Sequence, residues 1–191
     1  DVYKRQAHSV LSPALDGFFE QSSLAYRKGL GRTRAAIRIR DAIQRGYRFA
    51  LRADFSRFFD MIPHDRLAHR LSAYLADDHA VSLIMRWIAA GSPFEHRGLP
   101  TGSPLSPLLA NLFLDGFDED VERGGSTLVR YADDFLILYR RREDADAVYQ
   151  AAAESAANLA LTLNESKTNH VGIDAPFDFL GFRFQRGERW E

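Results

Sequence analysis

Helical spacing of apolar residues predicts three amphipathic helices in the first half of the chain. Residues 34–45 carry a single apolar face, as a helix packed on a core does. Pro63 can open a second helix, because proline suits the first helical position. Asp77 or Asp78 can cap a third helix, whose apolar residues stay aligned until Gly91 ends it.

Two further helices are predicted in the second half. Ser106 followed by Pro107 is a start signal, with serine as the N-cap and proline at the first helical position. The residues that follow are apolar on most sides, so this helix is expected to be buried. Residues 143–160 are rich in alanine and should form another helix.

Strand-like runs alternate with these helices. Residues 47–55 form one run, and residues 128–131 and 135–139 form two more that are separated only by Ala-Asp-Asp. Such a short separation predicts a hairpin with aspartates at its tip. Residues 177–184 alternate aromatic and polar side chains around a glycine, which predicts a second short hairpin. The order of elements indicates the α+β class.

Composition narrows the possible functions. The chain contains no cysteine, which excludes disulfides and thiolate metal sites. No apolar run approaches the roughly 18 residues of a membrane span. The net charge is −1, yet residues 27–52 hold nine lysines and arginines against one acid. This basic block predicts a surface for phosphates, unless it is merely a solvated helix face.

The acidic residues at the first hairpin suggest a metal site. Asp133 and Asp134 lie together at a turn between buried strands, where their repulsion requires a compensating cation. Asp54 ends another strand-like run and could join them. Three converging carboxylates are what two-metal phosphoryl transfer requires. Aspartate pairs also occur without any metal, and we interpret Asp77 and Asp78 as a helix cap.

The sequence YADDFLILY, which contains this pair, resembles the YxDD motif of reverse transcriptases of the bacterial group II intron-like type. Four other segments resemble family motifs in the expected order: ADFSRFFDMIPH, GLPTGSPLSPLLANLFL, LTLNESKT and FLGFRF. The resemblance covers residues 24–185. The segment YRKGLGR and the wording of the GLPTGSP segment are most similar to the CRISPR-associated branch.

The resemblance implies the fingers and palm of a right-hand polymerase, with an antiparallel sheet packed on helices and the thumb absent. The whole chain would be a partial reverse transcriptase domain. Its fingers would comprise residues 1–46 and about 79–98, its palm about 47–78 and 99–176, and its primer-grip hairpin 177–191.

The resemblance also implies catalytic roles. Asp54, Asp133 and Asp134 would hold two Mg²⁺ ions, or Mn²⁺ in their place, with help from the Phe55 carbonyl. Lys167 would protonate the departing pyrophosphate, although a solvent-exposed lysine is the alternative.

Other motif residues would contact the nucleotide or the primer. Phe59 would exclude a 2′-hydroxyl, the alternative being a core aromatic, since either Phe58 or Phe59 must face inward. Thr101 replaces the family's glutamine, which leaves its nucleotide contact in doubt, and Asn111 would contact the nucleotide or form hydrogen bonds inside the palm. The remaining implied contacts are Arg27, Lys28 and Arg32 with the triphosphate, Gly102 with the nucleotide, and Leu180 and Gly181 in the primer grip.

The function so implied is an RNA-directed DNA polymerase in the bacterial cytoplasm. Its partners would be an RNA template, a DNA or RNA primer, deoxynucleoside triphosphates and a fused or associated CRISPR integrase, with no membrane. A non-catalytic, maturase-like RNA-binding module is the alternative. An RNA-dependent RNA polymerase is disfavoured by Phe59 and by a YADD core.

Overall fold

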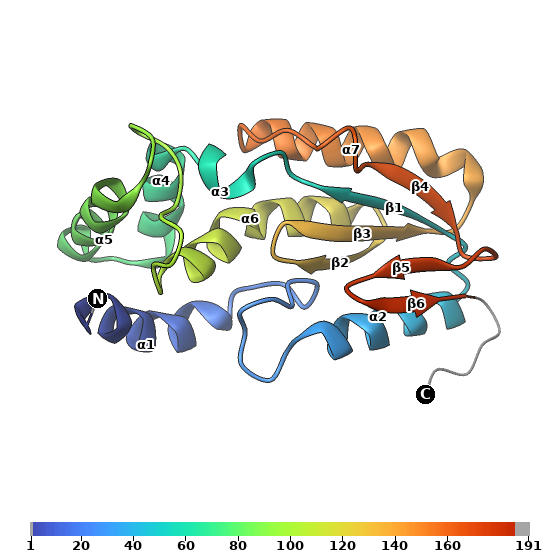
Figure 1. Ribbon diagram of the computed structural model, residues 1–191, viewed down its shortest axis with the longest axis horizontal. Helices are drawn as coiled ribbons and strands as arrows, with labels where there is room; N and C mark the ends of the chain where they lie inside the picture. Colours follow the sequence, from blue (N-terminus) through green and yellow to red (C-terminus); the bar gives the residue numbers. More distant parts are fainter. Residues whose placement is uncertain (1, 186–191) are drawn as a thin grey trace.

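An antiparallel four-stranded sheet forms the centre of the computed structural model, which describes residues 2–185 (Figure 1). Its strands follow the order β2-β3-β1-β4, where β1 is Phe49–Asp54, β2 Thr127–Tyr131, β3 Asp134–Tyr139 and β4 Asn169–Gly172. The hairpin predicted from residues 128–139 is therefore present as β2 and β3. The register pairs Asp54 of β1 with Asp134 of β3, which brings distant parts of the chain together.

The two faces of the sheet pack against different layers. Leu51, Phe135 and Ile137 belong to one buried cluster together with α6 (Ser106–Arg123) and α7 (Ala145–Asn158). The alternate residues, such as Leu136 and Leu138, belong to a second cluster with α2 (Arg32–Gln44). Successive side chains of a strand point to opposite faces of the sheet. Since both faces are buried here, neighbouring positions are apolar, which explains the nearly continuous apolar runs.

The predicted helices are confirmed, with two changes at their starts: Pro63 occupies the N-cap position of its helix and not the first helical position, and Ser106 is not a cap. They are α2, α4 (His64–Tyr74), α5 (Asp78–Gly91), α6 and α7, the last preceded by a short 3₁₀ turn at Arg142–Asp144. Asp77 caps α5 by accepting hydrogen bonds from the amides of His79 and Ala80. Ser106 is not a cap, because its hydroxyl donates to the Pro100 carbonyl while Leu105 occupies the N-cap position.

Three elements lie outside the sequence prediction. They are α1 (Val2–Asp16), the single-turn helix α3 (Phe58–Met61) and the edge strand β4. The first contains an internal proline, Pro13, and the other two are only four residues long. An internal proline and a short length both hide an element from pattern analysis.

Residues 22–24 cover the outer edge of β2. The amide of Arg130 donates to the Ser22 carbonyl, and the amide of Leu24 donates to the Arg130 carbonyl. Ser23 and Arg130 thus form a parallel bridge. Covering an edge strand in this way satisfies its backbone groups and fixes the preceding segment against the palm.

The second predicted hairpin is also present, as β5 (Phe177–Phe179) and β6 (Phe182–Phe184). Leu180 and Gly181 form its tip with φ of 53° and 84°, as in a type I′ turn. Residues 186–191 of the predicted primer-grip segment lie outside the described residues. Among residues 2–185, no helix has the length and apolar character needed to cross a membrane.

Candidate active site

The three predicted aspartates line a single cavity. Asp54 and Asp134 are direct cross-strand partners, so their side chains point to the same face of the sheet. Asp133 lies in the two-residue loop between β2 and β3. Together with Lys167 and four other residues, they surround a cavity of about 570 Å³. The convergence of Asp54 with the distant hairpin is therefore confirmed.

The hairpin loop has an unusual backbone. Ala132, its first residue, has a φ of 60°, in the left-handed region that favours glycine. A non-glycine residue there costs roughly 1 kcal/mol or more. This strain lies directly before Asp133, so the turn must be held in place by its surroundings.

Lys167 reaches the site from a turn that is attached to the end of β1. The amide of Asn164 donates to the Asp54 carbonyl, and the amide of Lys167 donates in turn to the Asn164 carbonyl. This places Lys167 Nζ 2.6 Å from Asp54 Oδ2. The ammonium group supplies a positive charge among the three carboxylates, which raises the pKa of Lys167 through its hydrogen bond and charge contact with Asp54.

The pKa values of the Asp133 and Asp134 carboxyls are both raised, which favours their neutral form over the anion. Partial burial raises the pKa of Asp133, the Asp54 charge adds to the effect, and Lys167 and Arg130 oppose it. Burial also raises the pKa of Asp134, together with Asp54 and Asp133, against the effect of Arg52. Clustered acids with such shifts are typical of functional sites.

The carboxylate and carbonyl oxygens of this cavity are the kind of ligand that Mg²⁺ and similar divalent cations bind. Asp54 Oδ1 is buried without any hydrogen-bond partner, so it has an unused acceptor position. Phe55 forms a main-chain bridge with Leu163, whose two hydrogen bonds run from the Asn164 amide to the Asp54 carbonyl and from the Ser56 amide to the Thr162 carbonyl. The Phe55 carbonyl takes part in neither bond. No three carboxylate or histidine side chains within residues 2–185 are already arranged as a metal-ligand group.

The two adjacent phenylalanines divide between the core and the surface. Phe58 is 2% exposed and packs in the core, while Phe59 is only partly buried and contacts Phe58 edge-on with ring centroids 5.3 Å apart. The backbone carbonyl of Phe59 accepts a hydrogen bond from the Leu99 amide. Phe59 is therefore the ring that is available to a ligand, and its role as a steric gate stays a prediction.

The glycine-rich segment after α5 packs beside Phe59. Gly98 has a φ of 87°, and a Cβ there would lie 3.3 Å from the Phe59 carbonyl oxygen, so glycine is required. Thr101 and Gly102 are exposed, and Gly102 has open space around it with a φ of 82°. Their nucleotide contacts stay predictions.

Among the three predicted triphosphate-binding cations, Arg27 has a different role. Its guanidinium forms an ion pair with Asp16 and donates to the backbone carbonyls of Asp16, Glu20 and Ser23. These bonds leave it only 10% exposed, so it is a structural residue in this fold. The sequence could not reveal this because the partner Asp16 belongs to α1, which was not predicted.

Lys28 and Arg32 keep exposed side chains and are free to meet a phosphate-bearing ligand as predicted. Arg32 also lies beside the second hairpin: its Nη1 is 3.9 Å from where a Cβ on Gly181 would be. On the same side, Arg52 Nη1 donates to the Asp178 carbonyl. Arg32, one of the predicted triphosphate-binding cations, is therefore a neighbour of the predicted primer-grip residue Gly181 in space.

Asn111 lies inside the molecule. Its amide nitrogen donates to the Ala25 carbonyl, and its oxygen accepts from Arg130 Nη1. Only 1% of the residue is exposed. Of its two proposed roles, the structure supports hydrogen bonding within the palm and not a nucleotide contact.

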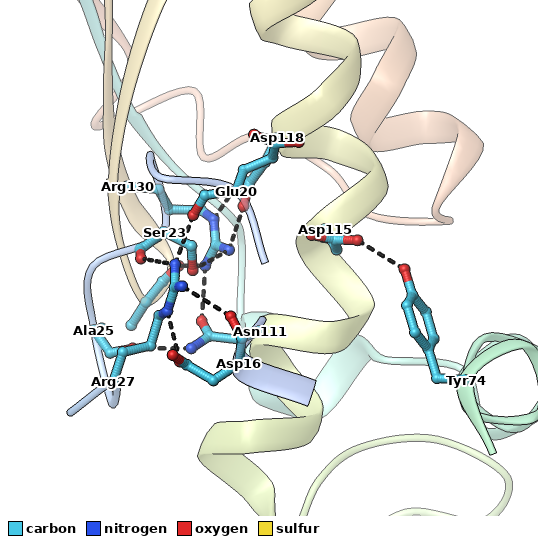
Figure 2. Close-up of polar contacts among 11 residues, drawn as sticks. Asp16, Glu20, Ser23, Ala25, Arg27, Tyr74, Asn111, Asp115, Asp118 and Arg130 are labelled. Carbon is cyan, nitrogen blue, oxygen red and sulfur yellow. Dashed lines mark hydrogen bonds and ion pairs between the residues drawn. The ribbon is translucent and has the colours of Figure 1, made fainter. Parts of the chain in front are cut away.

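A buried ion pair that was not predicted from the sequence lies behind the turn formed by Ala132 and Asp133. Arg130 of β2 and Asp118 of α6 are 1% and 0% exposed, respectively, and form two hydrogen bonds (Figure 2). The only signals were an arginine within the apolar run LVRY and one of several acids in the second half of α6. Buried charges of this kind occur almost only as pairs, which could have suggested the contact.

Comparison with known proteins gives a family match over nearly the whole chain. The family model described as reverse transcriptase (RNA-dependent DNA polymerase) matches residues 2–184. The protein YkfC of Escherichia coli K12 is 26% identical over 180 residues, which covers 73% of this chain and 47% of YkfC. A 91 kDa protein in the cob intron of Schizosaccharomyces pombe is 33% identical over 119 residues, covering 59% of this chain and 15% of that protein. This chain thus spans less than half the length of these relatives.

Solved structures share the fold. Apo telomerase from Candida tropicalis superposes with a TM-score of 0.72 at 11% identity, covering 96% of this chain and 38% of that chain. At this level of identity, the similarity establishes the fingers-and-palm fold alone. A chain of a partial Cas6-RT-Cas1–Cas2 complex is 36% identical with a TM-score of 0.41, covering 82% of this chain and 30% of that chain.

Proposed function

This chain belongs to the reverse transcriptase (RNA-dependent DNA polymerase) family, and from that premise we propose that it adds deoxynucleotides to a primer by two-metal phosphoryl transfer. The family match confirms the predicted resemblance to reverse transcriptases, and relatives named as intron proteins support the group II intron-like type. The observation that carries the proposal is the pairing of Asp54 with Asp134 beside Asp133 in one cavity.

The residues of the cavity have complementary roles in this reaction. Asp54, Asp133 and Asp134, with the Phe55 carbonyl, would hold two Mg²⁺ or Mn²⁺ ions, which supply activation of the attacking hydroxyl and stabilise the leaving oxygen. The unpaired Asp54 Oδ1 and the raised pKa values of the other two carboxyls support this role. Lys167, released from Asp54, would donate a proton to the pyrophosphate as it departs.

Residues around the cavity would select and orient the nucleotide. Phe59 presents a partly exposed ring, which would exclude the 2′-hydroxyl of a ribonucleotide. Lys28 and Arg32 would bind the triphosphate, since both are exposed and arginine binds phosphate through two parallel hydrogen bonds. Thr101 and Gly102 would lie along the nascent base pair, and the turn at Leu180 and Gly181 would contact the primer.

The macromolecular partners follow from this reaction. They would be an RNA template and a DNA or RNA primer, because the family is described as RNA-dependent and a polymerase extends an existing 3′ end. An association with a CRISPR integrase is proposed from the similarity of the segments YRKGLGR and GLPTGSPL alone.

A non-catalytic RNA-binding module is the second candidate. Relatives that carry the names of intron proteins favour it, including a putative COX1/OXI3 intron 2 protein of Saccharomyces cerevisiae that is 30% identical over 128 residues. A pure binder gains nothing from three carboxylates in one cavity, because acids repel phosphates. Binding without nucleotide incorporation would favour this candidate.

The decisive experiment compares Asp133→Asn with Asp78→Asn in the full-length protein. We expect Mg²⁺-dependent incorporation on a primed RNA template to fall at least about 10²-fold in the first variant, because a metal ligand contributes several kcal/mol to the transition state. Asp78 is an exposed helix residue of the other aspartate pair, so its variant should retain wild-type activity. Incorporation that survives in Asp133→Asn would refute the proposed mechanism.

A further inference from the structure

Arg130 uses every donor that its side chain has. Its five N–H groups are matched by five hydrogen bonds: two to Asp118 and one each to Asn111, the Ala132 carbonyl and Ser23 Oγ (Figure 2). The donor–acceptor distances run from 2.5 to 3.1 Å. A side chain so fully engaged and only 1% exposed has one fixed orientation.

One of these bonds acts directly on the catalytic turn. Arg130 Nη1 donates to the Ala132 carbonyl at 3.0 Å, and that carbonyl belongs to the peptide that leads into Asp133. Ala132 has the strained φ of 60°. A hydrogen bond from a buried, rigid donor therefore holds the peptide plane whose orientation determines where the Asp133 carboxylate points.

The other bonds connect the same guanidinium to the segment before α2. Ser23 Oγ accepts from Arg130 Nη2, and the backbone of Arg130 is bonded to Ser22 and Leu24. Asn111, itself bonded to Arg130, donates to the Ala25 carbonyl two residues before Arg27. The segment 22–27 is thereby attached to the β2 strand, and the exposed Lys28 follows it immediately.

We propose that Arg130 is a positioning residue that sets the catalytic turn and segment 22–27 in a fixed relation through one buried guanidinium. Asp118 holds and neutralises the guanidinium, and the remaining donors place the Ala132–Asp133 peptide and the segment that leads to Lys28. The role deepens the proposed polymerase function, because it concerns the geometry of the same metal-binding carboxylates. Lysine could not replace Arg130, since it has three donors in place of five and no planar arrangement.

The test separates this role from simple structural support. Replacing both charges, as in Arg130→Met with Asp118→Leu, leaves no unpaired buried charge, so the fold can be retained while the bond to the turn is lost. Arg123→Met with Glu119→Leu is the matched control, because that pair joins neighbouring turns at the exposed end of α6. Circular dichroism and thermal unfolding of the full-length proteins establish which variants are folded.

Two measurements then report on the turn. Binding of Mn²⁺, followed by electron paramagnetic resonance, needs no turnover, and steady-state kinetics separate kcat from the KM for the nucleotide. In the folded Arg130 double variant, we expect Mn²⁺ affinity and kcat each to fall about 10–100-fold, the range seen when a group that orients a metal ligand is removed. The control pair should match the wild type in both.

A folded double variant with wild-type Mn²⁺ affinity overturns the inference, whether or not the wild type polymerises. If the double variant does not fold, the same measurements are made on Arg130→Lys. This variant keeps a positive charge beside Asp118 but cannot make all five hydrogen bonds. Wild-type Mn²⁺ affinity in Arg130→Lys overturns the inference equally. A wild type that binds Mn²⁺ without incorporating nucleotides contradicts the proposed function and leaves the metal-affinity comparison decisive for Arg130.

Discussion

Replacing Arg130 alone with methionine should be among the most destabilising single changes in this protein. Arg130 and Asp118 are 1% and 0% exposed, so the variant would leave an uncompensated carboxylate in the core. Removing one partner of a buried pair typically costs about 3–5 kcal/mol. For a domain of this size, such a loss corresponds to a fall in Tm of roughly 6–20 °C. Replacing Asp118 with an apolar residue in the same variant should recover most of the lost stability.

The penalty should also depend on pH, and its sign follows from the pKa of Asp118. Burial raises this pKa, whereas Arg130 lowers it. Without the arginine, the carboxyl is left with a folded-state pKa well above its ordinary value, so it can enter the core only as the neutral acid. Stability tied to a raised carboxyl pKa is lost as pH rises. Arg130→Met should therefore be closest to the wild type near pH 4–5 and furthest from it near pH 8.

Urea denaturation at these two pH values, with the slope m as a check on two-state unfolding, measures both effects. Arg123→Met is the control, since Arg123 also forms two ion pairs but is 68% exposed. Surface pairs contribute about 0–1 kcal/mol, so the control should barely change stability. If Arg130→Met cost no more than Arg123→Met, the interpretation of Arg130 as an organising residue of the core would be wrong.

Two other predictions concern the cavity itself. Asp134→Asn should raise Tm by about 2–4 °C at pH 7–8 in EDTA. Burial and neighbouring acids raise the pKa of Asp134, so its ionised carboxylate opposes folding as pH rises through that pKa. Thermal scans should show the gain in Tm disappearing near pH 4, and an equal gain at about pH 4 would contradict this explanation. Phe59→Ala, with the buried Phe58 left intact, should admit ribonucleotides. The ratio of kcat/KM for deoxynucleotides to kcat/KM for ribonucleotides should fall by about 10-fold or more. An unchanged ratio would show that Phe59 does not select the sugar.

The parts of the fold that were predicted correctly depend on local patterns. The hairpin at 131–134 follows from two apolar runs separated by a very short turn, and α5 follows from a capping aspartate and regular spacing. The convergence of Asp54 with this hairpin needed a pairing across 80 residues, which periodicity cannot supply. The order of the family motifs supplied it, and the register of β1 with β3 confirms it.

One physical cause limited the prediction for Arg27 and Asn111. Arg27 was expected to contact the triphosphate, and Asn111 either the nucleotide or the interior of the palm; in the structure, Arg27 is bonded to Asp16 of α1 and Asn111 to Ala25. A polar residue type shows what a side chain can bind, whereas its partner depends on tertiary packing. Arg130 shows the reverse error, because its apolar neighbours concealed a residue with five polar contacts.

The alternation of side chains along β2 and β3 explains how one sheet can be rigid and still carry the proposed catalytic carboxylates. Arg130 is paired with Phe135 and faces the α6 layer, whereas Asp134, one residue earlier on β3, faces the opposite side with Asp54. On the Asp54 side of the sheet, the strand ends expose repelling carboxylates, while the rest of that side packs against α2. The opposite face can supply rigidity through a buried ion pair and a continuous apolar cluster without occupying space that the substrates need. Because one strand carries both faces, a bond made behind the sheet can fix the backbone in front of it. This is why Arg130, which lies behind the sheet, is expected to alter the affinity of the proposed metal site.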